Sequence, residues 1–446
     1  MVLLSQIAQM LNLQWSGKDV EIRGFNTDSR TIKPQDLFIA LPGERFDGHD
    51  YLSQVAQAGA AAVITSRDVV TSLPILSVEN TYQALFELAR QWRMKFKTPM
   101  ACITGSCGKT STRALLQNIC ATVGPTLASE KSFNNEIGVP LTLLRLREEH
   151  QFAVLELGAN HPGEIAKLVK IAKPNVATIT NAGPAHLAGF GNIEGVARAK
   201  GEIFRELPED GFAVINQDDP FADFWRESVR EAECLTFGVH QHADIMAANI
   251  HFNREFKPSF VLQTPLGHRI VQLQLLGEHS VANALAAAAC AYALGISLDH
   301  IKQGLETGLA EVRRLNEKRG FANATIIDDS YNANPASVKA AIDVLSKRDG
   351  TLVLVLGDML ELGAGSGEWH EKIGQQAQSA GIQHLFCFGD QSQMAAKAFG
   401  ASAYHFNSQD ELVKNLRQIL NDQVTVLVKG SNSMGMNKVV EALLRE

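Results

Sequence analysis

Short apolar runs alternate with amphipathic segments along most of the chain. From residue 100 onward, four apolar runs separated by helical patterns are typical of buried strands: "MACITG", "FAVLELG", "VATITNAG" and "GFAVINQ". Because strands that are apolar along their whole length are covered on both faces, these runs predict a parallel sheet flanked by helices. A second alternation starts near residue 313, with the runs "ATIIDDS", "TLVLVLGD", "IQHLFCFGD" and "VTVLVKGS". It predicts another α/β sheet, of the Rossmann type.

The first hundred residues follow a smaller version of the same pattern. The runs "DLFIAL", "AAAVITS" and "PILSV" predict short strands, and "YQALFELARQWRMKF" predicts the helix that ends this part. Pro99 disfavours continuation of that helix and indicates a linker. Farther on, the helix "SVANALAAAACAYALG" ends at Gly295, a suitable C-terminal cap. We therefore expect an α/β protein of three domains, at residues 1–97, 98–312 and 313–446.

Composition narrows the class of protein. The 446 residues are 45% hydrophobic and 20% charged, as in ordinary soluble proteins, and the formal net charge is −7. That charge argues against nucleic acid or an anionic membrane as the main partner. No apolar run is long enough to span a bilayer, and the amphipathic helix pattern "MVLLSQIAQMLNLQ" lacks the features of a signal peptide. Six scattered cysteines without a C-x-x-C pair fit reduced thiols, so we expect a cytoplasmic protein.

The segment "MACITGSCGKTSTRALLQ" has the order strand, glycine-containing turn, helix. Backbone N–H groups and the positive end of a helix bind phosphate in such loops. The common pattern G-x-x-x-x-G-K-[ST] is not met, because an isoleucine stands at its first glycine; the loop is the shorter T-G-x-x-G-K-T, with Gly105 and Gly108. We expect Lys109 to reach the β- and γ-phosphates and the Thr110 hydroxyl to bind Mg²⁺.

Other polar residues follow the central strands, where open α/β sheets bind ligands. Glu156 closes "FAVLELG" and suits a hard cation, although a glutamate in that place is often structural. His186 in "NAGPAHLAGFG" and Lys200 in "GVARAKGEIF" would each be unremarkable alone, as a loop histidine and an exposed helix lysine. The Asn- and Gly-rich runs "SFNNEIGVP" and "LGANHPGEI" favour recognition of substrate amides and hydroxyls, or are turn chemistry only. Cys107 is either a reactive thiol or a small residue that the loop tolerates.

Together these motifs resemble the Mur ligase family, nearly end to end. The matching segments are "TDSR", "FDGHDYL", "TGSCGKTS", "FNNEIGVPLTLL", "LELGANHPGEI", "AHLAGFG", "AKGEIF", "GEHSVANALAAAA", "DDSYNANPASV", "GDMLELG" and "LVKGS". The pair "DDSYNANP" and "GDMLELG" is similar to that of the members that add D-alanyl-D-alanine to UDP-N-acetylmuramoyl-tripeptide. The short phosphate loop is the variant that this family uses.

The resemblance implies the following chemistry. ATP phosphorylates a substrate carboxylate, and the incoming amine attacks the acyl phosphate. The product would be UDP-N-acetylmuramoyl-pentapeptide for peptidoglycan in the cell wall. The implied fold has a central ATP-binding parallel sheet of the P-loop type, a smaller α/β N-terminal domain for the UDP-sugar and a Rossmann-like C-terminal domain. ATP and Mg²⁺ would be required, the partners would be the two substrates with no nucleic acid and no membrane insertion, and we expect a monomer.

The resemblance also assigns residues. The nucleotide contacts would be Gly105, Ser106, Cys107, Gly108, Lys109, Thr110 and Ser111, with Asn283 at adenine and Asp329 at ribose. The metal ligands would be Thr110, Glu156, His186 and Lys200, the last as a carbamate; with Lys109 and Arg314 they form the catalytic set. The UDP-sugar would meet Asp28, Ser29 and Arg30, and the muramyl peptide Asn134 and Asn135. D-alanyl-D-alanine would bind near Asn332, Asn334 and Asp358.

The sequence departs from the family pattern at four places. They are Ser132 for asparagine, Ser280 for asparagine, Val312-Arg313 for Pro-Gly, and Asn432 for arginine. The third leaves open whether Arg313 or Arg314 approaches the phosphates. Other functions also stay open: a sibling ligase that adds one amino acid, a folate-polyglutamylating ligase, a regulator that lost catalysis, and a kinase or GTPase. The Asn-rich loops speak against the last.

Overall fold

The computed structural model describes residues 1–43, 46–130 and 133–444. The chain forms two compact units. The first comprises Met1–Cys102, Gly124–Ala159 and Glu164–Asn175, and the second comprises Ile103–Val123, Asn160–Gly163 and Val176–Glu446. Strand β7, Met100–Thr104, begins in the first unit and ends in the second.

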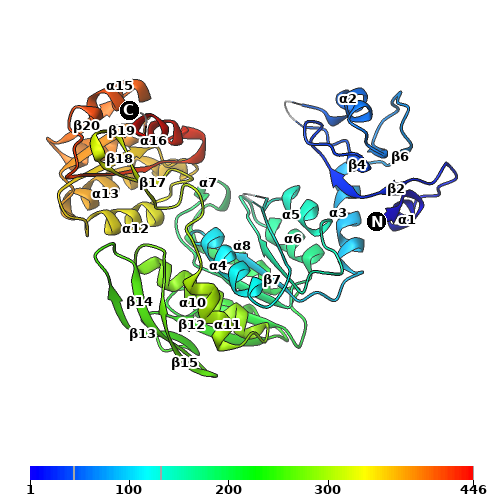
Figure 1. Cartoon of the computed structure of the whole chain (residues 1–446), viewed down its shortest axis with the longest axis horizontal. Coiled ribbons are helices and arrows are strands. Elements are labelled where there is room, and N and C mark those ends of the chain that lie inside the picture. The colour runs from blue at the N-terminus through cyan, green and yellow to red at the C-terminus, as the bar shows by residue number, and fades with distance from the viewer. Residues whose placement is uncertain (44–45, 131–132, 445–446) are drawn as a thin grey trace. The chain divides into compact units, whose positions relative to one another are not determined.

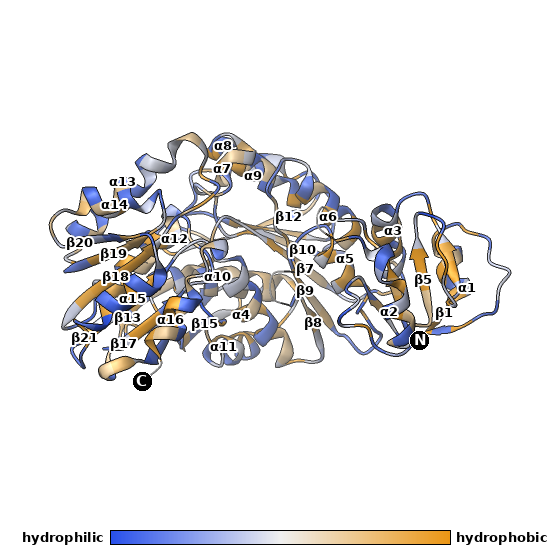
Figure 2. Cartoon of the chain, turned by 90° about the horizontal axis from the view of Figure 1, so that it is seen from above, coloured by the Kyte–Doolittle hydropathy of each residue, from blue (hydrophilic) through white to orange (hydrophobic). Residues whose placement is uncertain are grey.

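The first unit opens with a small parallel sheet of order β3-β4-β5-β6. Its elements are β1 Val2–Leu3, α1 Leu4–Met10, β2 Glu21–Ile22, β3 Gly24–Asn26, β4 Asp36–Ile39, η1 Gly48–Tyr51, α2 Leu52–Gln57, β5 Ala62–Thr65, β6 Ile75–Ser77 and α3 Thr81–Arg93. Strands β4 and β5 are fully buried, and Figure 2 colours β5 as hydrophobic. Phe38, Val55 and Val63 form the centre of the core here.

The rest of the first unit supports helix α3. Its elements are β8 Thr126–Ala128, α5 Gly138–Leu143, β9 Phe152–Glu156 and α6 Glu164–Ala172. Strands β8 and β9 are parallel, and α3 packs against α5 and α6. The indole N–H of Trp92 donates to the carbonyl of Leu146 (3.1 Å), and the Arg93 guanidinium donates to the carbonyl of Ala172 (2.9 Å). Buried polar atoms of α3 are thereby satisfied within the unit.

The second unit contains a sheet that is parallel over β10, β11 and β12 and antiparallel over β13, β14 and β15. The elements up to this sheet's last helix are α4 Lys109–Ala121, β10 Val176–Ile179, α7 Leu187–Phe190, α8 Ile193–Gly201, η2 Glu202–Phe204, β11 Phe212–Asn216, α9 Ala222–Ser228, β12 Glu233–Gly238, β13 Ile245–Phe252, β14 Pro258–Thr264, β15 Gly267–Gln272, α10 Glu278–Ala293 and α11 Leu298–Glu306. Helices α10 and α11 both pack against α4. The phosphate-loop helix is therefore held by two neighbours.

The C-terminal part of this unit is a six-stranded sheet of order β16-β17-β21-β18-β19-β20, parallel except at β16. Its elements are β16 Asn316–Arg319, η3 Phe321–Asn323, β17 Thr325–Asp329, α12 Pro335–Leu345, β18 Thr351–Gly357, η4 Gly363–Gly365, α13 Ser366–Ser379, β19 His384–Phe388, α14 Ser392–Phe399, β20 Ala403–Phe406, α15 Gln409–Arg417, β21 Val424–Lys429, η5 Asn432–Met434 and α16 Asn437–Leu443. Helices α12 and α13 lie on one face of the sheet, and α15 and α16 lie on the other (Figure 1). Two apolar layers result, as in doubly wound folds.

The α/β class and the parallel strands after residues 100 and 313 are confirmed, whereas two details differ from the prediction. The N-terminal helix is shorter than the pattern "MVLLSQIAQMLNLQ", since Val2 and Leu3 pair with β2 as strand β1. The antiparallel strands β13–β15 were not expected. Among the described residues, no helix combines the length and hydropathy that crossing a bilayer requires.

Candidate active site

The phosphate loop requires both of its glycines. Gly105 has φ +149° and Gly108 has φ +81°, backbone conformations that side chains rarely adopt. A Cβ atom at Gly105 would lie 1.8 Å from Oγ1 of Thr180, and one at Gly108 would lie 2.2 Å from Oδ1 of Asn283. Both residues therefore allow close approach of the loop backbone to neighbouring elements.

The segment after β10 holds this loop in place. The amide side chain of Asn181 accepts from the Cys107 N–H (3.0 Å) and donates to the Cys107 carbonyl (3.2 Å). The Thr180 hydroxyl donates to the same carbonyl, and Ser106 Oγ bonds both the N–H and the carbonyl of Gly183 (3.0 Å each). The loop conformation is thus fixed without a ligand.

Lys109 and Thr110 begin helix α4, with Ser111 half-buried in the same turn. The Lys109 ammonium donates to the Gly105 carbonyl (2.6 Å) and so lies over the loop. The guanidinium of Arg314 donates to the Thr110 hydroxyl (2.8 Å). This contact joins the start of the C-terminal part to the helix that follows the phosphate loop.

Arg313 and Arg314 point to different partners. Arg314 stacks on the Tyr331 ring, with its guanidinium carbon 4.4 Å from the ring centroid. Arg313 has φ +65°, donates to the carbonyl of Ser330 (2.5 Å), and lies 3.5 Å from the Asn432 side-chain oxygen. Of the two arginines, Arg314 is the one that reaches the phosphate loop.

His186 lies at the start of α7 in a left-handed conformation, φ +54°. Its Nδ1 is 2.5 Å from a carboxylate oxygen of Glu361. Burial lowers the pKa of His186; the Glu361 charge acts to raise that pKa, and the ammonium groups of Lys109 and Lys200 act to lower it. The imidazole is therefore influenced by charged groups from three of the quoted segments, "TGSCGKTS", "AKGEIF" and "GDMLELG".

Lys200 is buried, which contradicts the reading of an exposed helix lysine. Only 2% of its surface is accessible, on helix α8. Burial lowers the pKa of Lys200 well below its usual value, and the charge of Lys109 acts in the same direction. The indole of Trp225 donates to the Ala197 carbonyl (3.0 Å) and fixes the same helix.

Glu156 ends strand β9 as a buried carboxylate, 2% exposed. Its Oε1 accepts from the Asn134 side chain (2.8 Å), and its backbone N–H donates to Ser129 (3.1 Å). Among the described residues, Oε2 of Glu156 has no hydrogen-bond partner. A buried carboxylate oxygen without a partner is costly, and a cation would satisfy it.

Four other predicted residues of the first unit lie in local turns. Asn135 accepts from the N–H groups of Ile137 and Gly138 at the start of α5. Arg30 forms a bidentate pair with Asp28 (2.9 and 2.7 Å), which leaves the guanidinium exposed. Ser29 lies half-buried in the same turn.

The nucleotide candidates outside the loop are buried. Asn283 on α10 is 7% exposed and lies 3.4 Å from the Thr112 hydroxyl. Asp329 pairs with the buried ammonium of Lys429 (2.5 Å), and burial raises the pKa of this carboxyl despite the lysine. The departure Ser280 donates to the Leu276 carbonyl (2.6 Å), so its hydroxyl is satisfied within the helix start. The departure Ser132 lies outside the described residues.

The three predicted dipeptide-site residues lie in the C-terminal part. Asn334 caps α12 by accepting from the Ser337 N–H (2.9 Å), and its oxygen is 3.1 Å from the Cys107 sulfur. Asp358 accepts from the N–H groups of Gln391 and Ser392 and so caps α14. Asn332 is exposed, and its side-chain oxygen accepts from the N–H of the next residue, Ala333 (2.9 Å).

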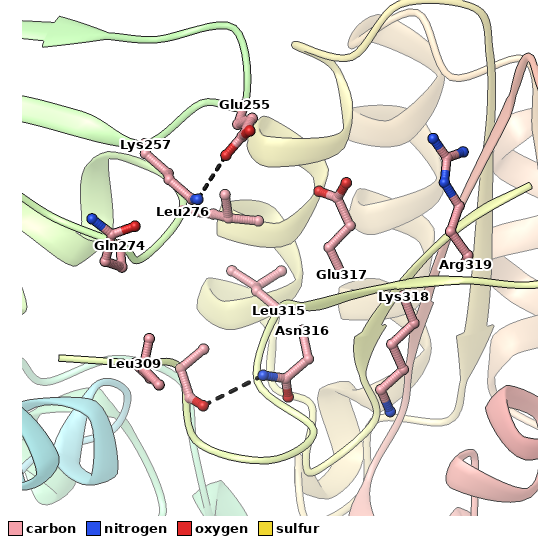
Figure 3. Close-up of a pocket in the computed structure, with 11 residues that line it drawn as sticks. Glu255, Lys257, Gln274, Leu276, Leu309, Leu315, Asn316, Glu317, Lys318 and Arg319 are labelled. Atoms are coloured by element: carbon pink, nitrogen blue, oxygen red, sulfur yellow. Dashed lines mark hydrogen bonds and ion pairs between the residues drawn. The ribbon is translucent and has the colours of Figure 1, made fainter. Parts of the chain in front are cut away.

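A separate pocket of about 510 Å³ is lined by strand β16 and by residues of the segments 255–257, 274–276 and 309–315 (Figure 3). Leu276, Leu309 and Leu315 line it together with charged residues. Lys257 is paired with Glu255 (2.6 Å). The pocket contains none of the predicted site residues, and we assign it no role.

Within the second unit, Arg314, Asn334 and Asn283 thus lie next to the phosphate loop or to the start of its helix. The charges of Lys109 and Lys200 act on the imidazole of His186. Glu156, Asn134 and Asn135 belong to the first unit. In the described part of the chain, no group of three or more His, Cys, Asp or Glu side chains could hold a metal ion.

Family models match three segments of the chain: the Mur ligase family catalytic domain at residues 21–93, the Mur ligase middle domain at 103–291 and the Mur ligase glutamate ligase domain at 313–432. UDP-N-acetylmuramoyl-tripeptide–D-alanyl-D-alanine ligase of Escherichia coli K12 is 42% identical over 445 residues, 99% of this chain and 98% of that protein. The chain belongs to the Mur ligase family. The corresponding ligase of Bacillus subtilis is 32% identical, over 95% of this chain and 93% of its own length.

Solved Mur ligase structures have the same fold. A crystal structure of MurF from Acinetobacter baumannii superposes with a TM-score of 0.92 at 37% identity, covering 99% of this chain and 98% of that one. MurF from Thermotoga maritima, in complex with ADP, gives 0.84 at 29% identity, covering 94% of this chain and 97% of that one. The predicted family and three-domain α/β fold are therefore confirmed.

Sequence reasoning missed several residues that shape this Mur ligase site. Thr180 and Asn181 hold the phosphate loop, Tyr331 supports Arg314, and Glu361 contacts His186. All four lie inside quoted motifs or strand ends, so position alone could have drawn attention to them. Their partners, however, are distant in sequence.

Proposed function

We propose that this chain is an ATP-dependent, ADP-forming ligase that joins D-alanyl-D-alanine to UDP-N-acetylmuramoyl-tripeptide. The product is UDP-N-acetylmuramoyl-pentapeptide for peptidoglycan synthesis. The observation that carries the proposal is the preformed phosphate loop with Lys109 over it and Arg314 on Thr110. It is supported by full-length similarity to ligases whose names state this activity and by a relative that binds ADP.

The reaction needs a leaving group on the tripeptide carboxylate. ATP supplies it by phosphorylating that carboxylate, and the amine of the dipeptide then displaces phosphate from the acyl phosphate. Lys109 and the loop N–H groups bind the phosphates, and Arg314 adds a further positive charge on closure of the site. Asn283 and Asp329 contact adenine and ribose. The Lys429 partner of Asp329 orients that carboxylate.

The residues present fit a magnesium ion. Glu156 offers a buried carboxylate oxygen that has no partner among the described residues, and Thr110 offers a hydroxyl at the phosphate loop. These two would hold one ion, and His186 with carbamylated Lys200 would serve a second. Bound Mg²⁺ offsets negative charge on phosphoryl oxygens. The protein residues supply the positions of these ligands.

The three domains divide the substrates. We place the boundaries at 1–97, 98–312 and 313–446, which the three family-model matches support. Asp28, Ser29 and Arg30 serve the UDP-sugar, and Asn134 and Asn135 lie on the muramyl-peptide path. Asn332, Asn334 and Asp358 form the region for D-alanyl-D-alanine. Because Asn334 and Asp358 cap helices, they act by holding backbone N–H groups in place, and Asn332 is the side chain most exposed to the dipeptide. The enzyme acts as a cytoplasmic monomer.

The purified chain is expected to form pentapeptide only when ATP, Mg²⁺, tripeptide substrate and D-alanyl-D-alanine are all present. Product mass after chromatography and ADP release are the measurements. Tripeptides with meso-diaminopimelate and with lysine are assayed side by side. Single amino acids and glutamate replace the dipeptide in control reactions, because they are the acceptors of the sibling ligases. A folded enzyme that gives no pentapeptide from either tripeptide would exclude this function.

Asn283→Ala is expected to raise the KM for ATP several-fold and to change kcat much less. The contact with the nucleotide is the same in the ground state and the transition state, so its loss weakens binding uniformly. The residue also lies against Gly108, so the melting temperature must be measured to separate loop disorder from lost adenine contact. A large fall in kcat at saturating ATP would show that Asn283 acts in the chemical step.

A further inference from the structure

The loop at residues 358–363 is anchored firmly to the C-terminal sheet. The Leu360 N–H donates to the Ser431 hydroxyl (2.8 Å), and the Ser431 N–H donates to the Asp358 carbonyl (3.0 Å). The Met359 N–H donates to Nε2 of the buried His370 (2.9 Å). Three hydrogen bonds therefore fix the start of this loop before it reaches residue 361.

Beyond that anchor the loop contacts the segment after β10 at two points. The Glu361 carboxylate oxygen Oε2 lies 2.5 Å from Nδ1 of His186. The Glu361 carbonyl accepts from the Ala188 N–H (3.2 Å), which ties backbone to backbone. Helix α7 and the turn η4 also contact each other. A main-chain hydrogen bond between the two segments thus accompanies the pairing of the carboxylate and the imidazole.

Both partners adopt backbone conformations that favour glycine. Glu361 has φ +64° and His186 has φ +54°, although neither is glycine. Left-handed conformations at such residues are uncommon and persist where the surrounding structure imposes them. Here the two side chains point toward each other, and that of Glu361 is 59% exposed whereas that of His186 is 26% exposed. The two backbone conformations therefore bring the carboxylate and the imidazole together.

An imidazole beside a carboxylate has a defined tautomer. The proton stays on the nitrogen that faces the carboxylate, and the other nitrogen keeps its lone pair as a metal or proton acceptor. With Nδ1 facing Glu361, that acceptor is Nε2. Charges of Lys109 and Lys200 act on the same ring, so His186 belongs to the region of the phosphate loop.

We propose that Glu361 is a positioning residue, which holds the proton on Nδ1 of His186 and so presents Nε2 as the metal-binding nitrogen. The contact also makes the loop at 358–363, which belongs to the dipeptide-binding part, a component of the ATP site. The proposal rests on the proposed function in one respect, the role of His186 as a metal ligand.

The test uses the full chain and three single variants. Glu361→Ala removes the carboxylate, Glu361→Gln keeps an uncharged acceptor, and Glu368→Gln is the matched control. Glu368 is exposed and lies in the first turn of helix α13, only seven residues farther along the chain than Glu361. Only variants whose melting temperature is close to that of wild type are compared. If Glu361→Ala fails to fold, Glu361→Gln takes its place in the test.

Two readouts do not depend on turnover. Imidazole ¹⁵N shifts of His186, assigned with a His186→Ala spectrum, report the tautomer. Electron paramagnetic resonance of Mn²⁺ with a non-hydrolysable ATP analogue reports metal affinity. We expect Glu361→Ala to lose the Nδ1–H form and to weaken Mn²⁺ binding about 10-fold or more, as for other partners of metal-binding histidines. For both readouts, Glu361→Gln should give values between those of wild type and Glu361→Ala, and Glu368→Gln should match wild type.

The double variant Glu361→Ala/His186→Ala distinguishes action through His186 from an independent effect. If Glu361 acts through the imidazole, its removal costs nothing further once His186 is absent. Equal losses in both backgrounds, or wild-type ¹⁵N shifts in Glu361→Ala, would overturn the proposal. Failure of the proposed function appears elsewhere, as absence of pentapeptide from the wild-type enzyme.

Discussion

Lys109→Ala is expected to lower turnover by orders of magnitude while leaving the fold intact. The ammonium lies over the phosphate loop, 2.6 Å from the Gly105 carbonyl, at the N-terminus of α4. In the proposed mechanism it contacts phosphoryl oxygens, whose charge shifts as phosphate moves from ATP to the carboxylate. Loss of one such preorganised donor lowers kcat by roughly 10²–10³-fold. Single-turnover phosphate release at saturating substrates is the measurement.

The melting temperature of Lys109→Ala should stay close to that of wild type, because the side chain is only half-buried. Lys347→Ala is the matched control, since it removes an exposed ammonium of the same unit far along the chain. It should leave both kcat and melting temperature unchanged. Near-wild-type turnover by Lys109→Ala would remove this residue from the mechanism.

The phosphate loop was predictable because its determinants are local. An apolar strand, two glycines and an amphipathic helix follow one another directly, and the positive φ angles of Gly105 and Gly108 agree with that interpretation. The fold class could be predicted for a similar reason, since strands buried on both faces leave continuous apolar runs. The conformation of the loop is thus determined mostly by its local sequence.

Strands β13–β15 escaped prediction because only one face of them is covered. Their burial alternates along β13 and β14, and β15 is mostly exposed. Polar residues therefore interrupt every apolar run, as in "IMAANIHF". A search for continuous apolar segments finds strands covered on both sides and misses these.

The residues at strand ends could be predicted, and their partners could not. Glu156 and His186 were found from their places after strands, whereas the contact between His186 and Glu361 joins residues far apart in sequence. The helix-capping role of Asn334 had a local signal, because an asparagine followed by proline is typical of a helix start. Lys200 had no such signal, since its burial depends on how α8 packs.

Lys200→Arg is expected to be as inactive as Lys200→Ala, although it conserves the positive charge. Only 2% of the surface of Lys200 is exposed, so its amine is held away from water. Because burial lowers the pKa of Lys200 well below its usual value, part of the enzyme carries this amine in its neutral form. A neutral amine adds to CO₂, forming an N–C bond and releasing a proton, and the lysine becomes an anion. That anion suits a metal site near Lys109 and His186, whereas an ammonium would repel Mg²⁺.

Arginine cannot follow this route, because its guanidinium stays protonated. Alanine leaves space where the carbamate stood, so added acetate or formate should restore part of the activity of Lys200→Ala and none of that of Lys200→Arg. Carbon-13 NMR of enzyme equilibrated with ¹³C-bicarbonate checks the modification itself, through a carbamate signal in wild type that both variants lack. Wild-type turnover by Lys200→Arg, with no such signal in the wild-type enzyme, would mean that the residue acts as a buried cation, and the reason for its burial would then be the charge of the bound phosphates.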